Sequence, residues 1–239
     1  MLPSEDLKLG YWTVARWRCI DVNSAQAYFL DADQTPPGLS KKEGSKYSRT
    51  DFYLEQLLDC LKHLPSIVYY VADGFYDKSK IINGLVENEK HLITKLRTDA
   101  NLKYLNHKPR KDRQKGASRK YNGKVKFDDL SKWDLIGSDE KYPHLAIYTQ
   151  KLFAVSFDRT LRVVLLLNTK TNKYVLLACT DAELDARLVV KYYQLRFQIE
   201  FIFRDAKQFM GLDNCQARDE NKLDYHRTGD PVQCLPECR

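Results

Sequence analysis

The chain has 239 residues, of which 43% are hydrophobic and 12% aromatic, so it can bury a real core and wholesale disorder is excluded. Lys and Arg number 39 against 32 Asp and Glu, and this excess of +7 is compatible with a polyanionic partner. No stretch approaches the roughly 20 apolar residues of a membrane span, and the first residues do not resemble a secretory signal. We therefore expect a cytoplasmic protein.

The first third of the chain predicts an α/β core. Residues 11–22 and 26–36 alternate in polarity as two strands that Asn23 and Ser24 would join. From residue 49 to 64 the apolar residues recur with a helical period, and Thr50 or Asp51 would cap that helix.

Two further strands and a helix follow. Residues 66–76 form an apolar run, typical of a strand buried on both faces, that is broken at Asp73 and Gly74. A helix is predicted over 77–90 with Asp77 at its N-cap, and residues 91–96 predict another buried strand.

The middle of the chain changes character. Between residues 95 and 126, twelve basic residues face only two acidic ones, Asp99 and Asp112. Such a stretch is either an exposed loop or a contact with nucleic-acid phosphates, with Tyr104 and Tyr121 available to stack on an unpaired base. The basic residues are Lys95, Arg97, Lys103, Lys108, Arg110, Lys111, Arg113, Lys115, Arg119, Lys120, Lys124 and Lys126.

Strand-like stretches at 141–157, 159–170 and 172–180 complete a mostly β segment. The resulting division is an N-terminal part of the core at 1–97, a β-rich insertion at 98–178, a C-terminal part of the core at 179–226 and an irregular tail at 227–239. Thr180 and Asp181 would cap the helix of the third part, with Glu183 completing a capping box.

That helix carries a polar seam in the stretch KYYQLRFQIEFIFRDAKQFMGLDN, residues 191–214. At about 100° per residue, four polar side chains fall within an arc of about 60°, along the edge of the apolar face. The simplest interpretation is a solvated face with an Arg196–Glu200 ion pair. The other is a metal and phosphate site, with Glu200 as the metal ligand and the remaining three binding phosphate oxygens. The four are Tyr193, Arg196, Glu200 and Lys207.

Asp73 is the other candidate site residue. A carboxylate at the end of a buried strand is where α/β folds place ligands, although Asp-Gly is also a common turn dipeptide. Together with a Glu on a helix, Asp73 would resemble the carboxylate cluster of a two-metal phosphoryl-transfer site.

The spacing Tyr193-x2-Arg196-x3-Glu200-x6-Lys207 resembles the Y-R-E-K signature of bacterial insertion-sequence transposases of the DDE type, in the group named after insertion sequence four. Residues 68–97 look like the segment that carries the second catalytic Asp of that family. The resemblance implies an RNase H-like α/β core, a mixed sheet with flanking helices that a mostly β insertion interrupts. It also implies cleavage at transposon ends and strand transfer into target DNA with Mg²⁺ or Mn²⁺, by a homodimer in a synaptic complex. Asp73 and Glu200 would be catalytic metal ligands, whereas Tyr193, Arg196 and Lys207 would bind DNA.

The family's first catalytic Asp lies on a strand ahead of the one matched by residues 14–22, and no such strand precedes it here. Asp6 is badly placed for that role, and Asp21 falls on the following strand. We therefore expect a fragment that lacks the first core strand, is truncated at both ends and is catalytically impaired. The alternatives are a non-enzymatic DNA-binding remnant and an RNase H-like nuclease that recruits Asp21 as its missing ligand.

Overall fold

A computed structural model of the chain describes residues 14–25, 27–34, 39, 47–106, 120–139 and 141–198. The chain forms two compact units, one of residues Met1–Pro37 and Leu195–Arg239 and the other of Gly38–Gln194. Among the described residues no helix has the length and apolar character needed to cross a membrane.

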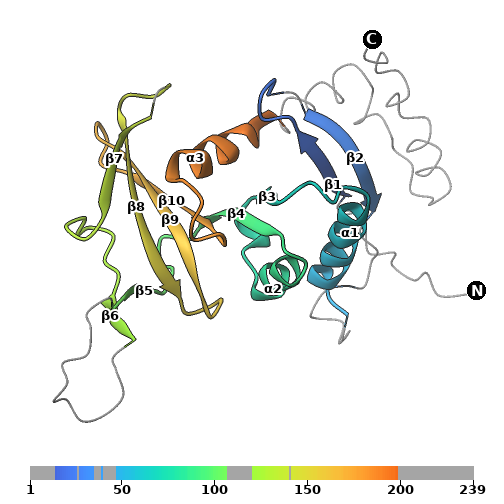
Figure 1. Cartoon of the computed structure of the whole chain (residues 1–239), viewed down its shortest axis with the longest axis horizontal. Helices are drawn as coiled ribbons and strands as arrows, with labels where there is room; N and C mark the ends of the chain where they lie inside the picture. Colours follow the sequence, from blue (N-terminus) through green and yellow to red (C-terminus); the bar gives the residue numbers. More distant parts are fainter. Residues whose placement is uncertain are drawn as a thin grey trace, which may run out of the picture. The chain divides into compact units, whose positions relative to one another are not determined.

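In the first unit, the described chain begins with a β-hairpin (Figure 1). Strands β1 (Val14–Ile20) and β2 (Ala27–Gln34) pair antiparallel, with a register shift between Trp17 and Arg18. The carboxylate of Asp21 closes the connection, because it accepts hydrogen bonds from the Asn23 N–H at 2.9 Å and the Ser24 hydroxyl at 2.7 Å. These bonds lower the pKa of Asp21, the Ser24 bond most. The predicted pair of strands is confirmed.

The second unit is built on an eight-stranded mixed sheet. Strand β3 pairs parallel with β4, β4 pairs antiparallel with β10, and the remaining pairs are all antiparallel. This is the mixed α/β class expected from the sequence. In spatial order the sheet contains β3 (Tyr69–Ala72), β4 (His91–Leu96), β10 (Tyr174–Cys179), β9 (Arg159–Asn168), β8 (Leu145–Ala154), β5 (Leu102–Leu105) and β6 (Tyr121–Lys124), with β7 (Asp134–Ser138) also on β8.

Strand β3 is shorter than the apolar run predicted, and most of it is only partly buried. The run overestimates the strand at its start, because Ile67 and Val68 precede β3. The break predicted at Asp73 and Gly74 is confirmed, because Phe75 and Tyr76 belong to the short 3₁₀ helix η2 (Gly74–Tyr76).

Two helices flank β3 in the sequence and contact each other. Helix α2 (Ser79–Glu87) also contacts β4 and buries Ile81, Ile82 and Leu85, and its N-cap is Lys78 rather than the predicted Asp77. Helix α1 (Arg49–His63) buries Leu57 and Leu61.

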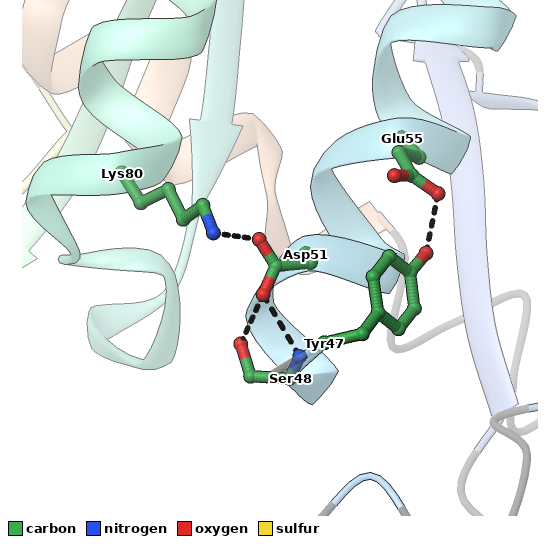
Figure 2. A network of polar contacts seen from close by, with 5 residues as sticks. All are labelled: Tyr47, Ser48, Asp51, Glu55 and Lys80. Atoms are coloured by element: carbon green, nitrogen blue, oxygen red, sulfur yellow. Dashed lines mark hydrogen bonds and ion pairs between the residues drawn. The ribbon is translucent and has the colours of Figure 1, made fainter. Parts of the chain in front are cut away.

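The N-cap of α1 is Ser48, not the predicted Thr50 or Asp51. Asp51 instead lies one turn inside the helix, and its Oδ2 accepts hydrogen bonds from the Ser48 N–H at 2.8 Å and the Ser48 hydroxyl at 2.6 Å. Its other carboxylate oxygen forms an ion pair with Lys80 of α2, as Figure 2 shows. Asp51 therefore fastens the start of α1 both to its own cap and to α2.

Helix α3 (Ala186–Leu195) covers part of one face of the sheet. It begins later than predicted, because Asp185 rather than Thr180 accepts a hydrogen bond from the Arg187 N–H, at 2.8 Å. Thr180 instead extends the pairing of β10 with β4: its N–H donates to the Leu92 carbonyl at 3.0 Å, and its hydroxyl oxygen accepts from the Leu92 N–H at 2.9 Å. The helix packs Val189 and Val190 against a cluster from β4, β9 and β10.

Candidate functional site

Asp73 directly follows β3, at the carboxyl end of that strand, and is exposed. Its Oδ1 accepts a hydrogen bond from the Phe75 N–H at 2.9 Å, which caps η2. Its carbonyl oxygen accepts a hydrogen bond from the Thr94 hydroxyl at 3.0 Å, and Thr94 lies on the neighbouring parallel strand β4. The backbone of Asp73 is thus fixed to the sheet while its carboxylate faces solvent. Asp73 can therefore be both a turn residue and a candidate metal ligand.

Helix α1 supports the turn after Asp73. The ring of Tyr53 on α1 is buried and lies 5.8 Å from the ring of Phe75 and 6.1 Å from the ring of Tyr76, between centroids. On the other side, a Cβ at Gly74 would come within 3.3 Å of the Lys95 carbonyl oxygen, so the turn lies close against β4. These contacts restrict the position that Asp73 can take. No local pattern in the sequence points to Tyr53, because this packing joins residues about twenty positions apart.

Asp77, four residues further, is a second carboxylate of the same turn. Burial raises its pKa, although Lys78 and Arg97 oppose the effect. Its Oδ1 is buried and finds no hydrogen-bond partner. Asp77 is therefore not the helix cap predicted from the sequence but a partly buried acid beside the candidate site.

Of the four residues of the polar seam, the structure describes two. Tyr193 on α3 is partly buried and packs against the core cluster, at the border of the apolar face. Arg196 follows α3, and its guanidinium carbon lies 5.4 Å from the centroid of the exposed Phe197 ring. Glu200 and Lys207 lie outside the described residues, so their roles stay predictions.

Helix α3 contacts the segment around β7 from both of its ends. Gln194 Nε2 donates to Asp139 Oδ2 at 2.9 Å, and Asp139 follows β7. In the first turn of the helix, the Arg187 guanidinium donates to the Ile136 carbonyl at 3.1 Å. These bonds fix the helix that carries Tyr193 to β7.

The other flank of α3 contacts the start of β3. The rings of Tyr192 and Tyr69 lie 5.7 Å apart between centroids, and the Tyr69 hydroxyl donates to Asp181 Oδ2 at 2.8 Å. Burial together with this hydrogen bond raises the pKa of Tyr69 to about 12. Sequence reasoning missed this contact too, since it spans more than a hundred residues.

The basic segment is described at residues 95–106 and 120–126, whereas its six other basic residues lie outside the described part. Tyr104 is only 8% exposed, so the prediction that it stacks on an unpaired base is wrong. The Tyr121 ring lies 4.5 Å from the Phe153 ring between centroids, and the Lys103 ammonium lies 5.2 Å from the Tyr121 centroid.

Within the described ranges, no group of three or more His, Cys, Asp or Glu residues could hold a metal ion. Asp73 supplies an exposed carboxylate at the end of β3, the kind of oxygen ligand that Mg²⁺ prefers. Asp73 therefore fits one ligand position of a divalent metal. The second carboxylate that such a site needs is the predicted Glu200.

Comparison with known proteins identifies a family for this chain. A search of curated proteins finds no match to the chain. A family model described as the transposase DDE domain matches residues 49–226, which include α1, Asp73, the β-rich segment and the polar seam. Because this match covers well over half of the sequence, the chain belongs to the transposase DDE domain family.

Proposed function

We propose that this chain acts on DNA in transposition, by metal-dependent cleavage at transposon ends and strand transfer, and that Asp73 and Glu200 are its catalytic carboxylates. The observation that carries the proposal is the placement of Asp73. It is exposed at the carboxyl end of strand β3, which pairs parallel with β4. Ligands of open α/β sheets bind at that end of the strands.

In this proposal the chain's own residues hold and orient the reactants. Asp73 and Glu200 would bind Mg²⁺ or Mn²⁺ through carboxylate oxygens. When bound, a pair of such ions lowers the pKa of water and stabilises the leaving oxygen in phosphoryl transfer. The hydrogen bonds from Phe75 N–H and the Thr94 hydroxyl fix the Asp73 carboxylate and backbone. A fixed ligand does not have to reorganise during the reaction.

Tyr193, Arg196 and Lys207 would contact DNA phosphates, as the Y-R-E-K signature of the insertion sequence four group suggests. The partial burial of Tyr193 against the core supports a positioning role, because a side chain held by packing presents its hydroxyl in one place. We further propose that two copies pair two transposon ends in a synaptic complex.

The test is cleavage of a labelled duplex by the full chain with Mg²⁺ or Mn²⁺. Asp73→Asn and Glu200→Gln should each lower the rate by a factor on the order of 100 or more, as loss of a catalytic group does. Asp158→Asn is the matched control, because Asp158 is an exposed carboxylate in the β8–β9 turn with a φ of 50° that Asn accepts. Cleavage that survives both catalytic changes would refute the assignment.

Two other outcomes are informative. If the chain binds the duplex in a salt-sensitive way but does not cleave it, the chain is the non-enzymatic DNA-binding remnant. Cleavage that needs Asp21 would indicate the alternative nuclease, although both carboxylate oxygens of Asp21 already accept hydrogen bonds within the β1–β2 connection.

A further inference from the structure

In the eight-stranded sheet, strands β5, β6, β8 and β9 carry two cross-strand pairs in which both residues are positively charged. Lys103 on β5 lies directly opposite Lys124 on β6, and Lys151 on β8 lies directly opposite Arg162 on β9. Directly opposed residues of neighbouring strands project from the same face, and like charges in that arrangement destabilise a sheet. An anion bound beside these pairs would therefore relieve their repulsion.

Both pairs lie on one face of the sheet. Phe153 lies opposite Lys103 across β8 and β5, and it is two residues from Lys151 on the same strand. Residues two apart on a strand share a face. Lys124, Lys103, Phe153, Lys151 and Arg162 thus form one continuous row of positions over four strands, which we call the basic row.

Within the described ranges, Lys151 is the cation of the basic row that forms an ion pair. Glu183 accepts a hydrogen bond from the Lys151 ammonium at 2.5 Å, and its own side chain is 79% exposed. The Nε of Arg162 is buried and has no hydrogen-bond partner. Helix α3 covers the adjoining part of this face, where Cys179 lies opposite Arg162 in the buried cluster.

Aromatic contacts hold one of these cations in place. Tyr121 packs on Phe153, and the Lys103 ammonium lies against the Tyr121 ring. A cation over an aromatic ring is attracted by the quadrupole of the ring. The Tyr121 ring is thus used within the protein, which argues against the base-stacking role predicted for it. A restrained ammonium loses less entropy when it binds an anion.

We propose that the basic row binds the phosphate backbone of duplex DNA, away from Asp73 and without sequence preference. Three strand spacings and two residues along β8 separate Lys124 from Arg162, which gives a row about 16 Å long. Duplex DNA carries about nine phosphate charges over that length. This inference rests on DNA being the partner that the proposed function requires.

The test is fluorescence anisotropy of a labelled 20-base-pair duplex with the full chain, between about 50 and 200 mM salt. Lys103→Gln combined with Lys124→Gln removes two proposed phosphate contacts, which should lower the salt slope by about 1.8. At 0.1 M salt, that slope corresponds to a loss of affinity of about 60-fold. Lys170→Gln combined with Lys173→Gln is the control, because it removes two exposed lysines from the β9–β10 turn.

A third variant tests the aromatic support. Tyr121→Leu keeps an apolar contact with Phe153 and should weaken binding about twofold to fivefold, but only when Lys103 is present. Circular dichroism confirms that each variant is folded. If the Lys103/Lys124 variant binds as the control does while the wild type binds duplex, the basic row is refuted and the proposed function stands. If the wild type does not bind duplex even at the lowest salt, both proposals fail.

Discussion

The Asp51 carboxylate should contribute more to stability through its bonds to Ser48 than through its ion pair with Lys80. Asp51 is only 8% exposed, and its side chain accepts both Ser48 hydrogen bonds. The Lys80 side chain is 58% exposed, so water and salt screen the ion pair. We expect about 1–2 kcal/mol from the capping bonds and at most about 1 kcal/mol from the pair.

Three substitutions separate these contributions. Asp51→Ala should cost about 2–3 kcal/mol, which corresponds to a fall in Tm of about 4–12 °C for a chain of this size. Asp51→Asn keeps an acceptor for Ser48 and should cost about 1 kcal/mol, whereas Lys80→Met should cost less than 1 kcal/mol. Asp59→Ala, which removes an exposed carboxylate paired with Lys62 on the same helix, should leave Tm unchanged.

The assay is urea unfolding followed by circular dichroism, supported by thermal melts at the same pH. A Lys80→Met loss as large as the Asp51→Ala loss would show that the ion pair dominates and would refute the reasoning. Because α1 also carries Tyr53, which packs on the turn after Asp73, the destabilised variants should cleave DNA more slowly at temperatures near their Tm.

Two further predictions concern buried polar groups. Burial raises the folded-state pKa of Asp77 above its unfolded value, so its ionisation lowers stability as the pH rises above about 4. Asp77→Asn should therefore raise Tm at pH 7, and thermal melts should show the gain shrinking toward pH 4; an unchanged gain would contradict this. Thr180→Val leaves the Leu92 N–H without its acceptor at a site only 1% exposed, and should cost about 2 kcal/mol in urea unfolding. Thr180→Ser keeps the hydroxyl and should cost less than half as much, so equal losses would exclude the hydrogen bond as the cause.

Local sequence patterns were sufficient for most elements of this fold. Strand β4 was predicted with its observed bounds, and the β1–β2 hairpin and helices α1 and α2 were placed to within a few residues. The hydrophobic period carries this information, because it reports which side chains face the core, and turn residues mark where an element ends. The position of Asp73 at the end of a strand also follows from the chain alone.

The N-cap residues of the three helices were not predicted correctly from the sequence. The N-caps of α1 and α2 are Ser48 and Lys78, and Asp185 accepts the first bond at the start of α3. The residues expected were Thr50 or Asp51, then Asp77, and then Thr180 with Asp181. Asp51 still takes part in capping, because its carboxylate accepts both hydrogen bonds from Ser48. Tertiary contacts decided the other two: Thr180 pairs with Leu92, and Asp77 is partly buried beside the Asp73 turn.

By itself, the sequence determined the α/β class, the strand that ends at Asp73 and the spacing of the polar seam. Only the tertiary structure decided which residues meet. It packed Tyr53 on the Asp73 turn, buried Tyr104 and aligned Lys124, Lys103, Lys151 and Arg162 in one row. The physical reason is that strand register joins residues distant in the chain, and a shift of one residue would send each side chain to the other face.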